Sequence, residues 1–128
     1  MKNKNPFRLF EIVAVFITVL LFLVLVLVQN GNYQAMLRDN VRKTAINAMY
    51  YALMEDYAAQ NGHFPEIINA EILPTVAAEL WTDPDGVMLG YPEAEYVYVP
   101  GDCYQGKCGS FRLIARMEKE DTYTKESW

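Results

Sequence analysis

The chain contains few of the residues that enzymes and metal proteins use. Among its 128 residues there are one histidine and two cysteines, too few for a four-ligand zinc site. Ser110 has no histidine and acid close to it in the sequence, and no glycine-rich phosphate-binding loop occurs. Eleven basic and sixteen acidic residues give a net charge of −5, which argues against nucleic-acid binding. We therefore expect no catalytic residues, no cofactor and no nucleic-acid partner.

Charge is also missing from a long stretch near the amino terminus. Residues 12–28 hold no charged side chain and a single polar one, Thr18. With the flanking Phe7, Leu9 and Phe10, this stretch is just long enough to cross a membrane. What remains of the chain suffices for one small domain. These proportions exclude a two-domain enzyme, a coiled-coil rod and a disordered acidic tail, and they indicate a small membrane-anchored module.

The apolar stretch could be a retained anchor, a cleaved signal peptide or a buried core helix. Signal peptides have apolar regions of ~7 to 15 residues that end in a site of small residues. Here the run is longer and is followed by Gln-Asn-Gly-Asn at residues 29–32, so we expect a transmembrane helix over residues 7–28 in the lipid bilayer. The first eight residues hold three basic side chains, and the next is Arg38. This bias predicts a cytoplasmic amino terminus in the cell membrane and an extracytoplasmic remainder.

Helical signals continue after the anchor. The sequence from about Tyr33 to Gln60 is rich in Ala, Met and Leu and has no proline, and Asn61-Gly62 is a typical helix end. We expect a helical stalk over residues 29–62, weakest at residues 30–32 (Asn-Gly-Asn).

Two apolar stripes run along this stalk at helical spacing. The stripe of large side chains is expected to pack on the head, and the stripe of mostly small ones to admit another helix. The first stripe consists of Ile46, Met49, Tyr50, Leu53 and Tyr57, and the second of Leu37, Val41, Ala45, Ala48 and Ala52.

Residues 63–128 predict a globular head. Pro74, Pro84 and Asp85-Gly86 interrupt helices, and three runs have strand character. We expect three or four antiparallel strands that pack on the long helix, which gives an α+β fold. Trp81, Tyr91, Tyr96 and Tyr98 are expected in the core, and the tail after Glu118 is expected to be loosely ordered. The strand candidates are Val87–Tyr91, which is the weakest, Tyr96–Val99 and Phe111–Met117.

Two pairs of residues in the head suggest specific bonds. Cys103 and Cys108 are separated by four residues that include Gly106, a spacing that a tight loop can close into a disulfide in an oxidising compartment. Two reduced thiols are the alternative. Asp83 and Asp85 are weak candidates for calcium ligands, because their spacing matches no complete calcium-binding loop and a plain turn is the default.

The charges are unevenly distributed. No Lys or Arg occurs between Thr44 and Gly106, where ten acids lie, whereas Arg38, Arg42 and Lys43 cluster on the stalk. We hypothesise that the basic stalk of one subunit meets the acidic head of another. A solvated charged face is the alternative interpretation.

Three segments resemble those of a known family and follow one another in the same order. The basic leader followed by Phe7, Leu9 and Glu11 is similar to the amino-terminal signature of type IV pilins and type II secretion pseudopilins. Residues 57–65 (Tyr-Ala-Ala-Gln-Asn-Gly-His-Phe-Pro) resemble the segment that ends the long helix of pseudopilins. Residues 80–86 (Leu-Trp-Thr-Asp-Pro-Asp-Gly) resemble the element that leads into their sheet. The order of these elements matches that of the family over nearly the whole chain.

The resemblance implies a structural role. Such subunits assemble through the amino-terminal helix with copies of themselves or other pilin-like subunits, at an inner-membrane assembly platform, into a pilus or pseudopilus. It implies that Glu11 pairs with the free amine of a neighbouring Phe7. An interfacial acid among lipid headgroups is the alternative for Glu11.

The chain departs from the family at Pro6. The family has glycine there, because prepilin peptidase cuts between this glycine and the following Phe. Proline constrains the backbone on both sides of the bond, so we expect poor processing and a retained cytoplasmic leader over residues 1–6. In that case Arg8 of a neighbour is the nearest substitute partner for Glu11. Pro6 also favours the alternative of a monomeric membrane-anchored binding module.

Overall fold

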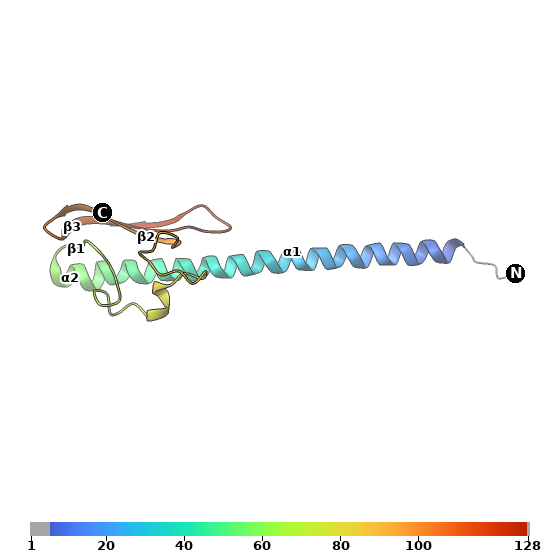
Figure 1. Ribbon diagram of the computed structural model, residues 1–128, viewed down its shortest axis with the longest axis horizontal. Helices are drawn as coiled ribbons and strands as arrows, with labels where there is room; N and C mark the ends of the chain where they lie inside the picture. The colour runs from blue at the N-terminus through green and yellow to red at the C-terminus, as the bar shows by residue number, and fades with distance from the viewer. Residues whose placement is uncertain (1–5, 128) are drawn as a thin grey trace. The chain divides into compact units, whose positions relative to one another are not determined.

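The computed structural model describes the backbone of residues 6–127 and the side chains of residues 8–127. The expected leader therefore lies outside the described residues, except for the backbone of Pro6, and processing at Pro6-Phe7 stays a prediction. Residues up to 35 and residues from 36 onward form two compact units. The elements are α1 (Pro6–Tyr51), a π-helix η1 (Ala52–Tyr57), α2 (Ala58–Asn61), β1 (Phe64–Pro65), a 3-10 helix η2 (Ala78–Trp81), β2 (Tyr96–Tyr104), β3 (Lys107–Ala115) and β4 (Tyr123–Glu126). The class is α+β, as expected (Figure 1).

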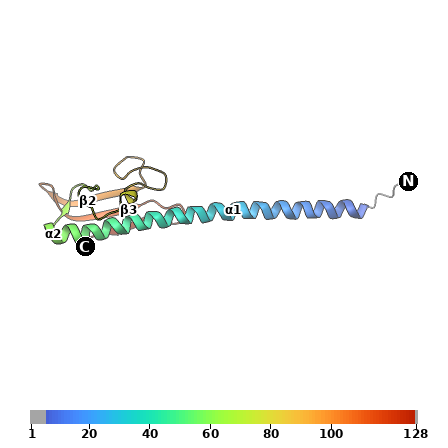
Figure 2. The ribbon, with the colours of Figure 1, turned by 90° about the horizontal axis from the view of Figure 1, so that it is seen from below.

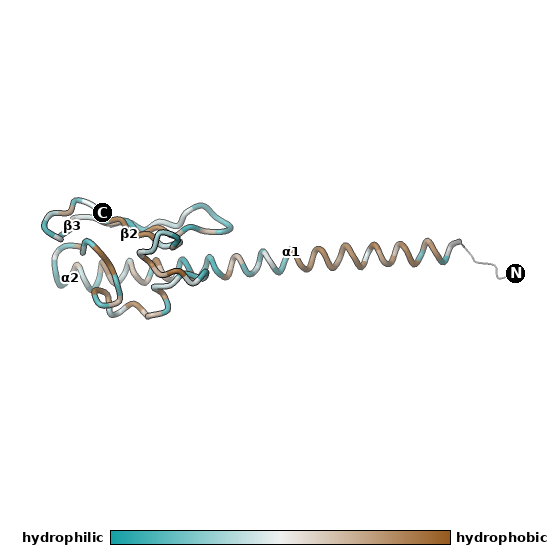
Figure 3. The backbone as a smooth tube through the Cα atoms, in the orientation of Figure 1, coloured by the Kyte–Doolittle hydropathy of each residue, from teal (hydrophilic) through white to brown (hydrophobic). Residues whose placement is uncertain are grey.

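The first unit is the apolar part of α1. Its large apolar side chains from Leu9 to Val28 are between 46% and 76% exposed, and Figure 3 shows this part of the helix in brown. The hydroxyl of Thr18 donates to the carbonyl of Ala14 at 2.6 Å, so this polar group is satisfied within the helix. The helix also continues through residues 30–32, the expected weak point, without interruption. A single glycine costs about 1 kcal/mol in a helix, too little to break a long cooperative one.

In the second unit the long helical segment ends where the sequence predicts. Gly62 adopts a left-handed conformation with φ of 71°, and its N–H donates to the carbonyl of Ala58 at 2.8 Å. Only glycine adopts this conformation without steric cost, so Asn61-Gly62 is a true helix end. The π-helical turn over Ala52–Tyr57 was not predicted, because such a widened turn has no periodic pattern of its own.

The sheet is antiparallel throughout, with β3 at its centre. Strand β2 pairs with one side of β3, and β1 and β4 pair with the other. The candidate Tyr96–Val99 is confirmed as part of β2, and the candidate Phe111–Met117 is confirmed as far as Ala115, where β3 ends.

Two expectations about the head's secondary structure are wrong. Residues 87–91 form no strand and make one isolated bridge, between Thr82 and Met88. Gly90 has φ of 99°, a turn conformation that ends any extended run there. The tail is also ordered as far as the structure describes it, because β4 pairs with β3. This pairing satisfies backbone groups of β3 that would otherwise be open, an interaction between distant residues that composition does not reveal.

The core forms where the stalk helix meets the sheet. Ile46, Met49 and Leu53 are fully buried in one cluster with Phe111 and Leu113 of β3, so the stripe of large side chains packs on the head as expected. Figures 1 and 2 show β2 and β3 running alongside this part of the helical segment.

The prediction that the stripe of small side chains admits another helix is partly wrong. Ala45 and Ala52 are 0% and 5% exposed and belong to the core, whereas Leu37 and Val41 stay exposed. The reason is that the loop between β1 and β2 also packs against the helix. This loop contributes Ile68, Leu73, Val76 and Trp81 to the same core.

The aromatic residues of the head divide between core and surface. Trp81 and Tyr96 are buried and Tyr98 is partly buried, as expected. Tyr91 is 63% exposed, which corrects the expectation that it fills the core. It follows Gly90 in the irregular loop, so no strand pairing holds its side chain inward.

Candidate functional site

The apolar helix is a candidate membrane anchor. It is long and apolar enough to cross a bilayer, and the side chains of its most apolar window are all unburied. Glu11 is exposed within it, near the start of the apolar run. A carboxylate beside a long apolar run costs a few kcal/mol in a membrane unless it is paired or reaches the interface, which keeps Glu11 a functional candidate.

The most elaborate polar arrangement in the described residues surrounds Arg42. This side chain is buried, 2% exposed, although it belongs to the stalk helix. Its Nη1 lies 2.8 Å from Asp39 Oδ1 and 2.8 Å from Glu118 Oε1, and its Nη2 lies 2.8 Å from Asp85 Oδ2. We call Asp39, Arg42, Asp85 and Glu118 the Arg42 cluster. It joins α1, the loop before β2 and the connection after β3.

Asp39 holds the backbone of the connection after β3. Its Oδ1 accepts the N–H of Glu118 at 2.8 Å, and its Oδ2 accepts the N–H of Lys119 at 2.9 Å. Burial opposes ionisation of this carboxyl, but these two N–H groups and Arg42 outweigh it and lower the pKa of Asp39. Asp39 is therefore charged at neutral pH and fixes the chain direction where β3 ends.

Glu118 is the most strongly perturbed carboxyl of the cluster. It accepts hydrogen bonds from Arg38, at 2.7 and 2.6 Å, and from Arg42. These bonds, with that from Arg38 as the largest cause, lower the pKa of Glu118 to about 2. Burial acts to lower the pKa of Arg42, but its hydrogen bonds to Glu118, Asp39 and Asp85 together outweigh burial and raise it.

The three basic stalk residues therefore have partners within their own chain. Arg38 and Arg42 bind Glu118, and Lys43 Nζ lies 2.7 Å from Glu120 Oε1. From the charge pattern we expected these cations to bind the head of another subunit, and that role stays a prediction. Asp39 and Glu118 were not among the expected site residues. A usable signal was present, because Asp39 and Arg42 fall at helical spacing on the same face as Ile46 and Met49.

The two calcium candidates have protein partners. Asp83 is buried, and its Oδ1 accepts the N–H groups of Asp85 and Val87 at 3.0 and 2.8 Å. Its Oδ2 accepts the N–H of Glu95 at 3.0 Å. Asp85 belongs to the Arg42 cluster. Within residues 8–127 no three His, Cys, Asp or Glu side chains are grouped to hold a metal ion. Asp83 thus organises the turn that precedes β2.

The disulfide is present as expected. Cys103 and Cys108 are bonded and lie opposite each other in the β2–β3 register, with Cα atoms 3.9 Å apart. The bond closes the tip of this hairpin, where Tyr104 is 76% exposed.

Two tyrosines of β2 are shielded from water, Tyr96 buried and Tyr98 partly buried. The hydroxyl of Tyr98 donates to the carbonyl of Pro65 at 2.6 Å, which ties β2 to β1. Burial, followed by the charge of Asp83, raises the pKa of Tyr96 to about 12. Burial also raises the pKa of Tyr98, so both side chains stay neutral at physiological pH.

Two arrangements thus stand out chemically. The exposed apolar helix with Glu11 is suited to lipid insertion and to packing against other helices, and the Arg42 cluster fixes two loops to the stalk helix. Comparison of the chain with protein-family models, with curated proteins and with solved structures finds no match in any of the three.

Proposed function

We propose that this chain is a single-pass membrane protein that serves as a structural subunit of a type IV pilus or type II secretion-like pseudopilus. The observation that carries the proposal is the apolar helix, whose large side chains from Leu9 to Val28 are all exposed in the single chain. It would assemble through this helix with copies of itself or with other pilin-like subunits, at an inner-membrane platform.

The exposed helix supports assembly for a physical reason. Lipid can cover these side chains while the subunit is in the bilayer, but a subunit that leaves the bilayer needs other helices to cover them. Each large apolar side chain that is fully buried contributes about 1.5 to 3 kcal/mol. Glu11 then requires a positive partner, which a neighbouring amino terminus or Arg8 would supply.

The arrangement of the second unit also supports a structural role. The helix from residue 36 onward lies in one core with the sheet, and the Arg42 cluster ties two loops to it. A subunit in a filament has to carry load between its helix and its head, and these contacts make that connection firm.

Cross-linking of the full chain in lipid vesicles would test the proposal. The natural cysteines are bonded to each other, so Phe16→Cys introduces a single reactive thiol into the apolar run. We expect disulfide-linked species that increase with the ratio of protein to lipid, and fewer of them when Glu11→Gln is added. A protein that stays monomeric at every ratio would contradict assembly through this helix.

The second candidate function is a monomeric, membrane-anchored extracytoplasmic binding module. Pro6, which stands where the family has glycine, favours it because poor processing would keep the subunit in the bilayer. Mass spectrometry of the native amino terminus separates the two. A start at methylated Phe7 supports a processed filament subunit, whereas an intact Met1 supports the resident module.

A further inference from the structure

Strand β2 has an open edge. Among the described residues its only strand partner is β3, and β2 is the last strand on its side of the sheet. The N–H of Arg116 donates to the carbonyl of Glu95 at 3.0 Å, and in an antiparallel pair such bonded positions alternate. The backbone of Val97 therefore faces β3, whereas the backbone N–H and C=O of Tyr98 face the open edge. Those of Tyr96 point the same way but are covered, because Tyr96 is buried.

The position of the proline in β2 agrees with this alternation of inward-facing and outward-facing residues. Pro100 occupies the next outward-facing position after Tyr98, and it has no N–H to donate. Proline is found in strands at such edge positions, where the missing donor costs no ladder bond. The open edge of β2 is therefore available for pairing at Tyr98, just before Pro100.

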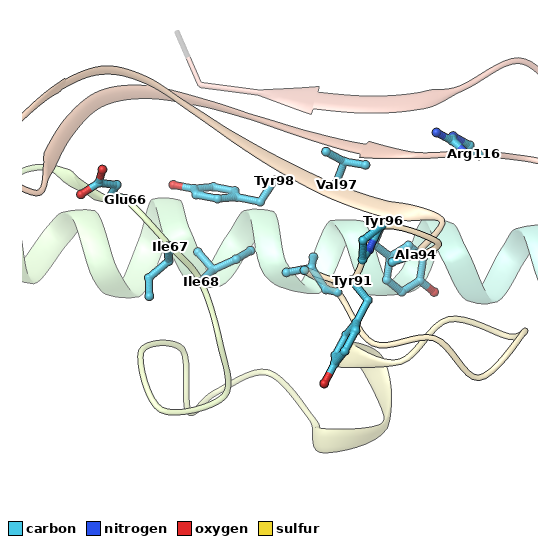
Figure 4. Close-up of a pocket in the computed structure, with 12 residues that line it drawn as sticks. Glu66, Ile67, Ile68, Tyr91, Ala94, Tyr96, Val97, Tyr98 and Arg116 are labelled. Carbon is cyan, nitrogen blue, oxygen red and sulfur yellow. The ribbon is translucent and has the colours of Figure 1, made fainter.

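A cleft of about 430 Å³ lies along this stretch. Three consecutive β2 residues, Tyr96, Val97 and Tyr98, line it. Because neighbouring side chains of a strand point to opposite faces, a cleft that contacts three in a row faces the edge of the strand. Residues 66–68 and 89–92 line the rest of the cleft, and Figure 4 shows several of these side chains around it.

The cleft combines open backbone groups with exposed apolar side chains. Ile67 and Tyr91, which line it, are 64% and 63% exposed although both are large and apolar. An extended polypeptide satisfies both features at once, since it supplies a regular row of N–H and C=O groups and alternating side chains. A compact small molecule lacks that row. The chemistry of the cleft therefore favours a peptide strand.

Charged side chains of the cleft define which residues suit the two ends of a bound peptide strand. Glu66 and Arg116 both line the cleft, and Figure 4 shows them at its opposite ends. We propose that the cleft binds an extended segment of a partner protein, which adds as a strand beside β2. The segment is aliphatic in its middle, basic at the end near Glu66 and acidic at the end near Arg116. This site goes beyond the proposed filament role and does not depend on it.

A labelled synthetic peptide tests the site on the full chain in detergent micelles. The probe is Lys-Val-Thr-Val-Thr-Val-Glu with blocked ends, and binding is followed by fluorescence anisotropy with empty micelles as the blank. We expect saturable binding that weakens about tenfold in Tyr91→Asp, because an aromatic contact is lost to a charge. Tyr104→Asp is the matched control, since Tyr104 is an exposed tyrosine at the hairpin tip, outside the cleft. It should leave binding unchanged.

Backbone pairing has its own readouts. The same peptide with N-methyl groups on its valines and threonines has no central N–H left to donate to the ladder, whichever alternate residues face β2, and should lose binding. Bound peptide should slow hydrogen exchange at the outward amide of Tyr98 and leave the amide of Val97 unchanged. Absent binding, equal binding of the methylated peptide, or an equal loss in Tyr91→Asp and Tyr104→Asp would each overturn the proposal.

Discussion

Arg42 and Asp39 form a buried ion pair one helical turn apart on α1, with Arg42 Nη1 2.8 Å from Asp39 Oδ1. Both side chains are under 5% exposed, because the turn before β2 and the connection after β3 close over them. Removing two charges from water is costly, and the cost is offset here by further bonds to both groups. The pair therefore depends on the loops that cover it, and the loops depend on the pair.

Removing Asp39 should destabilise the head strongly. Asp39→Ala leaves Arg42 with one carboxylate fewer and leaves the N–H groups of Glu118 and Lys119 without their acceptor. We expect a loss of about 3 kcal/mol in the free energy of unfolding. Urea titration of the full chain in micelles, followed by the fluorescence of buried Trp81, measures it.

The control for this substitution is Lys43→Ala. Lys43 pairs with Glu120 in a more exposed position, where an ion pair contributes under about 1 kcal/mol. If the two variants lose equal stability, the buried pair has no special role.

Acid should weaken the connection after β3. The pKa of Glu118 falls from an ordinary 4.5 to about 2 in the folded chain, chiefly through Arg38. A group with a lowered folded pKa contributes fully above its unfolded pKa and loses the contribution as pH falls toward the folded one. We expect the melting temperature to fall between pH 4.5 and pH 2 for this reason. Thermal unfolding across this range, at low salt, provides the measurement.

Arg38→Gln isolates the contribution of Glu118 to this acid response. The substitution removes the largest cause of the shift, so the pKa of Glu118 should rise toward its ordinary value. The fall in melting temperature attributable to Glu118 should then shrink. An unchanged pH dependence would show that Glu118 does not couple to Arg38 in solution.

Breaking the disulfide should have a modest effect. The two cysteines are five positions apart, so the bond closes a small loop and constrains the unfolded chain little. Replacing both with alanine is expected to cost about 2 kcal/mol in unfolding free energy. The β2–β3 ladder continues well beyond the bond, so the far-ultraviolet circular dichroism should keep its shape. Loss of the sheet signal would mean that the bond is required to form the hairpin.

Gly62 offers a test of the helix end. Its φ of 71° is strained for residues with a Cβ, although no atom beyond its own neighbours in the chain lies within 4 Å of the place where that Cβ would sit. Gly62→Ala should therefore cost about 1 kcal/mol through backbone strain alone. Gly62→Asn should cost less, because asparagine tolerates this conformation. Equal melting temperatures for the two variants would contradict a backbone origin.

Local patterns predicted those elements whose signals lie within a few residues of each other. The helix end at Gly62 and the Cys103–Cys108 bond were confirmed, as were the strands at Tyr96–Val99 and, up to Ala115, at Phe111–Met117. The prediction for the tail was wrong because β4 is formed by pairing with β3. The burial of Ala45 was missed because residues of a distant loop join the same core.

The sequence by itself determined the apolar helix, the α+β class and the position of the disulfide, since these follow from local composition, periodicity and spacing. Only the tertiary structure decided where the charges of the stalk are satisfied. Arg38, Arg42 and Lys43 find Glu118 and Glu120 more than seventy residues later in the chain. Charges interact through space, so residues that are remote in sequence become partners only when the fold brings them within hydrogen-bonding distance.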